Sequence, residues 1–245
     1  MKLSTIFQQL VHGELSQLSF GAGQGKIGPD DYDMITNNVN LGLSALYKRF
    51  KIKEGRLILR LEPGKYIYRL HSDHALSSRV GKDKYILDSK GNPFTDDINK
   101  IEKLYTEDGE ELPLNNPNEF LSTFNINQTT LEFHKNMVDN QEKIPEWWRG
   151  EQIKVVYRAG YGAAICCPSH YEPEMVEVDL PDIYLEALLY FVASRIHNPI
   201  GLNQEFNQGV NYAAKYEQEC IKLELLGLQM EDTALSNRFD RNYWC

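Results

Sequence analysis

Apolar residues recur with a helical period at both ends of this chain and with the spacing of short strands in its middle. Near the N-terminus, one helix face is marked by apolar residues at intervals of three or four: Ile35, Val39, Leu43, Leu46 and Phe50. Between residues 80 and 160, short alternating runs are separated by turn signals. The helical period returns in segments 181–197 and 204–226. The chain therefore has to combine helices from both ends with strands from the middle.

The turn signals of the middle region predict antiparallel hairpins. Two alternating runs flank the Asp108-Gly109 pair in "IEKLYTEDGEELPLN", and another two flank residues 127–128 in "STFNINQTTLEFHK". Before them, "RLILRLEPGKYIYRLHS" contains two short β-prone runs separated at residues 62–64, and "EQIKVVYRAGYG" predicts a final strand. Several short strands at this spacing indicate a compact β module.

This order of elements predicts an α+β fold, with an α-helical bundle domain formed by the N- and C-terminal helices and an inserted antiparallel β module. We expect the helical domain to comprise residues 1–54 and 176–226. The β module would take residues 55–175, and an extended C-terminal tail would take residues 227–245.

The two C-terminal helical segments differ in their apolar surface. Segment 181–197 is apolar around most of its circumference, so it is expected to be buried on nearly all sides. We interpret its excess apolar surface as a contact between subunits, made by Leu185, Leu188, Leu189, Phe191 and Val192. Segment 204–226 is amphipathic instead, through Phe206, Val210, Ala213, Ala214, Ile221 and Leu225.

Composition excludes several classes of protein. The 245 residues allow one large or two modest domains, and the net charge of -9 disfavours a protein that grips nucleic acid through phosphates. An acidic chain can still line a passage through which DNA slides. No apolar run approaches the roughly 20 residues of a membrane span, and no signal peptide is expected.

The residue types that carry chemistry do not form a known catalytic or metal-binding pattern. The glycine-dense stretch "SFGAGQGKIGPDD" lacks the hydroxyl residue of a phosphate loop, because Gly25-Lys26 is followed by Ile27. The four cysteines have no metal-ligand spacing, and His71 and His74 have no third ligand placed by sequence. We therefore predict no enzyme activity, no cofactor and no metal. The alternative is a soluble carbohydrate-binding or hydrolytic protein that uses the β module, where residues 147–148, two tryptophans, could stack a sugar or base.

Three parts of the chain carry a resemblance to a known family. "NNVNLGLSALYKRFKIKEGRLIL" resembles the helix-to-strand junction of head-to-tail adaptor proteins of tailed bacteriophages, the connector or tail tubular A type. "IKVVYRAGYG", then "LPDIYLEALLYFVASRIHNPIG" and a long charged helix, is similar to the C-terminal half of that family. "LYTEDGEELPLN" and "TTLEFHK" resemble the β insertion of its larger members. Residues 1–30 are not matched.

The resemblance implies a structural virion protein without enzymatic activity. Such a protein forms a ring with copies of itself, usually of twelve subunits, below the portal protein. The ring extends the DNA channel, lets DNA pass without specific binding and docks a tail or nozzle protein. The expected location is the neck of the virion, between capsid and tail, after assembly in the host cytoplasm. A related alternative is another tail or nozzle ring protein.

The end of the chain carries an aromatic cluster in a polar segment. By the same resemblance, residues 227–245 would climb onto the portal, with Phe239, Tyr243 and Trp244 as its docking residues. From the residues alone, the segment could equally fold back on its own domain.

Overall fold

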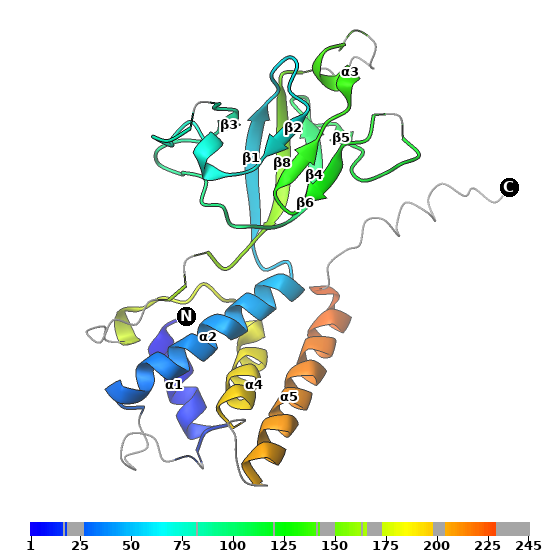
Figure 1. Cartoon of the computed structure of the whole chain (residues 1–245). Helices are drawn as coiled ribbons and strands as arrows, with labels where there is room; N and C mark the ends of the chain where they lie inside the picture. The colour runs from blue at the N-terminus through cyan, green and yellow to red at the C-terminus, as the bar shows by residue number, and fades with distance from the viewer. Residues whose placement is uncertain are drawn as a thin grey trace, which may run out of the picture. The chain divides into compact units, whose positions relative to one another are not determined.

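The computed structural model divides the chain into two compact units, Met1–Ile52 with Ala163–Cys245, and Lys53–Gly162 (Figure 1). We call them the helical unit and the β unit, and each is described by itself. The structure describes residues 1–16, 18, 27–81, 83–119, 121–140, 142, 150–162, 164–165, 173–197 and 204–228.

Among its described residues, the helical unit has four α-helices, with α4 at its centre. They are α1 (Leu3–His12), α2 (Pro29–Arg49), α4 (Leu185–Ile196) and α5 (Gln204–Leu223), which continues into a π-helical turn, η7 (Glu224–Leu228). Two 3-10 turns, η5 (Pro173–Met175) and η6 (Asp182–Tyr184), precede α4. Helices α1, α2 and α5 all contact α4 (Figure 1). The apolar face predicted for α2 is confirmed, because all five residues that define it are buried.

Close contact between α2 and α4 depends on a glycine. A Cβ atom added at Gly42 would lie 2.6 Å from Cδ1 of Leu188 and 3.0 Å from Cδ1 of Phe191. The missing side chain therefore lets the two helices approach. At the other side of the unit, the N–H of Leu3 donates to the carbonyl of Val176 at 2.9 Å, and the N–H of Val178 donates to the carbonyl of Met1 at 2.7 Å.

The β unit contains two antiparallel sheets. Strands β1 (Glu54–Arg60), β3 (Ile86–Leu87), β4 (Ile98–Thr106), β5 (Glu111–Leu112) and β8 (Gln152–Ala159) form the larger sheet in the order β3-β1-β8-β4-β5. Strands β2 (Ile67–Arg69), β7 (Thr130–Glu132) and β6 (Phe124–Asn127) form the smaller sheet in that order. A 3-10 turn, η2 (Ser72–His74), and a short helix, α3 (Lys135–Val138), complete the unit. Side chains from both sheets meet in one core cluster.

Polar side chains fix the long loop that joins β2 to β3. The ammonium group of Lys84 donates to the carbonyls of Asp73 at 2.9 Å, Ser78 at 3.1 Å and Val80. Beside it, the N–H of Ser77 donates to the Asp88 carboxylate at 2.8 Å, and the N–H of Phe94 does so at 3.0 Å. Backbone groups that no strand pairs are thus satisfied by side chains.

The predicted fold class is wrong. The middle of the chain is not a small module inserted in a helical bundle, because it forms a five-stranded and a three-stranded sheet around a core of their own. The protein is a mixed α/β structure with a five-stranded antiparallel sheet, a three-stranded sheet and α-helices. Local turn signals predicted the hairpins β4–β5 and β6–β7, which the strand pairing confirms. The pairing of β1 with β8 and of β2 with β7 joins residues far apart in the sequence, and periodicity does not report such pairs.

Candidate interaction surfaces

Helix α4 does not present the surface that its sequence suggests. Leu188, Leu189 and Val192 are buried within one chain, because α1, α2 and α5 surround them. Side chains enclosed in this way are not available to a neighbouring subunit, so the structure reassigns these three residues to the core. Leu185 and Phe191 are partly exposed, and the Phe191 ring lies 5.3 Å from that of Tyr216 on α5. The predicted excess of apolar surface is thus hidden by helices of the same unit.

The predicted docking residues Phe239, Tyr243 and Trp244 lie outside the described residues, and so do Trp147 and Trp148. Their roles stay predictions.

The chemical candidates are dispersed in the described part of the chain. His71 lies 3.3 Å from a carboxylate oxygen of Asp73 and 3.8 Å from one of Asp96, with all three side chains exposed to solvent. His74 stacks on Tyr85. No group of three or more potential metal ligands occurs among the described residues. Cys220 is buried, and burial raises the pKa of its thiol.

The surface that stands out belongs to α5. Val210, Ala214, Ile221 and Leu225 lie at intervals of four, seven and four residues, which places them on one side of the helix. We call them the outer stripe of α5. Val210 is 50% exposed, Ile221 49% and Leu225 81%. The opposite side faces the core through Tyr216, Cys220 and Leu223, which are all buried.

The outer stripe reverses the expected orientation of an amphipathic helix. An apolar stripe normally faces the core of its own domain. In α5, Val210, Ile221 and Leu225 are exposed, whereas a tyrosine, a cysteine and a leucine fill the inner side toward α4. The sequence signal was present in the spacing of Val210, Ile221 and Leu225, but spacing does not report which of two possible faces is covered. An apolar face in this position is a candidate interaction site.

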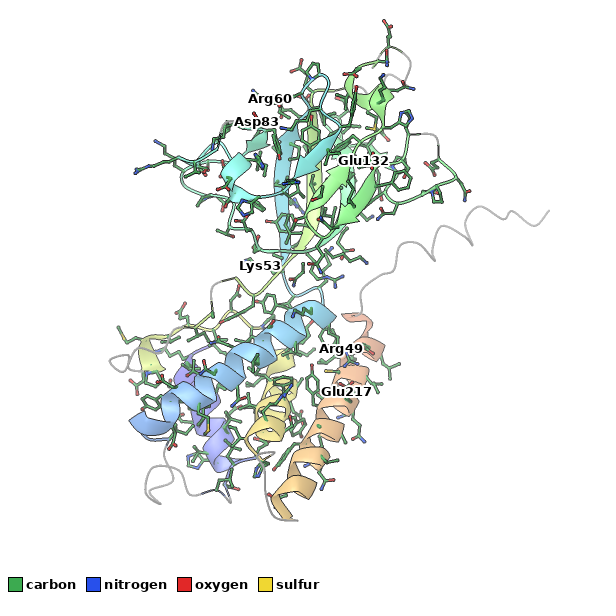
Figure 2. The ribbon with its side chains drawn as sticks, in the orientation of Figure 1. Arg49, Lys53, Arg60, Asp83, Glu132 and Glu217 are labelled. Carbon is green, nitrogen blue, oxygen red and sulfur yellow. The ribbon has the colours of Figure 1, made fainter. Side chains whose placement is uncertain are left out.

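Charged contacts hold α5 in this orientation. The guanidinium group of Arg49, at the end of α2, contacts Glu217 and Glu224, each at 2.7 Å (Figure 2). The hydrogen bond to Glu224 is the main cause that raises the pKa of Arg49 above its usual value, and Glu217 acts in the same direction, against burial. At the other end, the hydroxyl of Tyr212 donates to the carbonyl of Glu14 at 3.1 Å. These contacts oppose rotation of the helix that would bury the stripe.

A second exposed apolar surface lies on α2. Met34 is 44% exposed and Leu41 is 54% exposed, and the two are seven residues apart. We call them the outer pair of α2. Asp33 and Lys48 are exposed near its two ends. The outer pair points away from α4, because Ile35 and Leu43 face the core.

The smaller sheet of the β unit has an exposed apolar row of its own. Ile67 on β2 and Phe124 on β6 are both exposed, and each is paired with Glu132 on β7, between them (Figure 2). Ile126, on the edge strand β6, extends this row. A carboxylate at its centre makes the row less apolar than the outer stripe of α5.

A polar pocket adjoins the outer stripe. Its volume is about 410 Å³, and its lining includes Glu14, Tyr212, Ala214, Lys215 and Gln218. The ammonium group of Lys215 lies 5.0 Å from the Tyr212 ring centre, so the polar border of the stripe carries a positive charge on this side.

None of the described helices combines the length and the apolar character of a membrane span. In comparisons with known proteins, no family model and no curated protein matches this chain.

Proposed function

We propose that the protein is a structural virion component that assembles with copies of itself into a ring, the head-to-tail adaptor below the portal of a tailed phage. The observation that carries the proposal is the outer stripe of α5. Among the described residues, this regular apolar face is exposed while the core around α4 is closed, which is the arrangement expected of a protein that associates.

The distribution of charge supports the same proposal. The helical unit contains 10 of the 26 basic and 17 of the 35 acidic side chains, whereas the β unit contains 16 basic and 18 acidic ones. Segment 173–194 has no basic residue, and Glu174, Glu177 and Asp182 in it are exposed. Negative charge repels the phosphates of DNA, so such a surface suits a channel that must not retain its cargo.

The order of elements supports the identity of the ring. The helix-to-strand junction at residues 37–59 and the segment 153–201 carry the resemblance to phage adaptors. In the proposed assembly, the partners are the portal protein, a tail or nozzle protein and further copies of this chain. The C-terminal residues 227–245 would contact the portal.

Native mass spectrometry and negative-stain imaging of the purified chain test the proposal. We expect a concentration-dependent closed ring of identical subunits, with a central opening wide enough for duplex DNA. We also expect that addition of a cognate portal protein shifts assembly to lower concentration, because binding to the assembled state favours it by mass action. A chain that stays monomeric at high concentration and with the portal present would refute the ring.

A further inference from the structure

We propose that the outer stripe of α5 in one copy packs against the outer pair of α2 in the next copy. This inference rests on the proposed function, because it uses the requirement of a ring for two different surfaces on each subunit. A contact between two identical surfaces closes at the dimer, whereas a contact between two different surfaces continues from copy to copy until the ring closes.

The two surfaces belong to the same unit and cannot satisfy one another within a chain. Both α2 and α5 pack on α4, and their exposed apolar residues lie on the sides turned away from it. The inner sides of both helices are buried in the core, through Ile35 on α2 and through Tyr216 and Leu223 on α5, so neither helix can turn to bring the two surfaces together. Each copy therefore presents both surfaces at once.

The spacing of the apolar side chains matches across the two surfaces. Met34 and Leu41 are seven residues apart, and so are Ala214 and Ile221. Seven residues are two helical turns, or about 10.5 Å along each axis. The side chains of the outer pair can therefore enter the gaps between successive residues of the outer stripe, as knobs enter holes.

The charges that border the two surfaces are complementary. Lys215 and Lys222 lie along one side of the outer stripe. Glu217 and Glu224, on its other side, already face Arg49 of their own chain. Asp33 is exposed beside Met34 at the start of the outer pair. With the helices parallel Asp33 meets Lys215, whereas Lys222 already pairs with Glu219 of its own helix at 2.6 Å, so the charges favour the parallel direction.

A mixing experiment with two variants tests the pairing. Leu41→Asp places a charge in the outer pair and leaves the outer stripe intact. Ile221→Asp places a charge in the outer stripe and leaves the outer pair intact. Both residues are exposed, so each variant folds, which circular dichroism verifies. We expect each variant alone to need a concentration about 100-fold higher than the wild-type chain for assembly, because each contact would bury an unpaired carboxylate. Leu76→Asp, at an equally exposed leucine of the β unit, is the matched control and should assemble as the wild type does.

The mixture of the two variants gives the decisive result. Each variant supplies the surface that the other lacks, so we expect one-to-one pairs in native mass spectrometry that do not grow further. Absence of these pairs, when the wild type assembles, overturns this inference alone. Assembly of Leu41→Asp at the wild-type concentration does the same, and points to another occupant of the stripe. A wild-type chain that never assembles overturns the proposed function together with the inference.

The chain's own C-terminal segment is the other candidate occupant of the outer stripe. A chain ending at Leu228 separates the two cases. If residues 229–245 cover the stripe, Ile221→Asp lowers the thermal midpoint of the full chain but not of the shortened one, and the inference is overturned. If a second copy covers it, the substitution leaves both monomers equally stable.

Discussion

The two units of this protein differ in where their exposed apolar residues lie. In the β unit, one cluster joins both sheets, and its exposed large apolar residues lie in loops or beside the Glu132 carboxylate. In the helical unit, exposed apolar residues form regular rows on α2 and α5 although the core around α4 is closed. The comparison teaches that a complete core and an uncovered apolar face can occur in one unit. The exposed apolar rows of the helical unit make it the unit on which to test assembly.

The largest difference between the units is expected in the loss of stability when an ion pair is removed. Arg158 and Glu102 form a buried pair in the β unit at 2.6 Å, with 2% and 11% of the side chains exposed. Glu102→Gln leaves a charged guanidinium group in the interior, so we expect the free energy of unfolding to fall by about 3–5 kcal/mol. In the helical unit, Arg49→Ala removes two partly exposed pairs and should cost less than about 1 kcal/mol. Urea unfolding of both variants measures the difference, and equal losses would contradict it.

Core leucines test whether the units unfold separately. Leu188 on α4 and Leu131 on β7 are both fully buried. Replacement of either by alanine should lower the stability of its own unit by about 2–5 kcal/mol, since it leaves a cavity. We expect Leu188→Ala to shift an unfolding transition that Leu131→Ala leaves in place, as followed by amide hydrogen exchange. A single transition shifted by both variants would show that the two units unfold together.

Two glycines provide a finer comparison. Gly42→Ala pushes a methyl group toward Leu188 and Phe191, whose side chains can shift, and it also gains helix propensity. Gly55→Ala, on β1, places its Cβ 2.2 Å from the ring of Tyr157, which Asp97 holds through a hydrogen bond of 3.0 Å. We expect the strand variant to lose about 1–3 kcal/mol, and the helix variant to lose less. Thermal midpoints of the two variants and the wild type, measured at one protein concentration, test this order of losses.

Acid provides the smallest effect, and it is confined to the β unit. Burial acts to raise the pKa of Asp88, but hydrogen bonds from the Ser77 hydroxyl and from the N–H groups of Phe94 and Ser77 lower it below its usual value. The contribution of Asp88 to stability is therefore complete above about pH 4 and is lost as the pH falls through the lower pKa of the folded state. Asp88→Asn should reduce the acid sensitivity of the β unit. An unchanged pH profile would show that the loop tolerates a neutral side chain at no cost.

The sequence predicted what is local and failed where contacts are distant. Helix α2, the hairpins at residues 108–109 and 127–128, and strand β8 follow from periodicity and turn residues. The division of the strands into two sheets depends on pairs such as Glu54 with Arg158, which no local pattern specifies.

The sequence placed an interaction surface on α4, where the structure buries Leu188, Leu189 and Val192. The apolar character of α4 reflects three helical neighbours, whereas the exposed apolar row lies on α5. Amphipathicity gave the residues of the stripe, such as Ile221 and Leu225, but not their exposure. The inward face of α5 is formed by Tyr216 and Cys220, and a pattern of aliphatic residues does not identify these two as core positions.

The antiparallel pairing of β1 with β8 has a consequence for how this protein can change. Because Glu54 lies opposite Arg158, the chain enters and leaves the β unit at adjacent points on neighbouring strands. A short turn between residues 52 and 163 could bridge the same gap. An insertion that enters and leaves at adjacent points can be enlarged, exchanged or deleted without a change in the order of the helices.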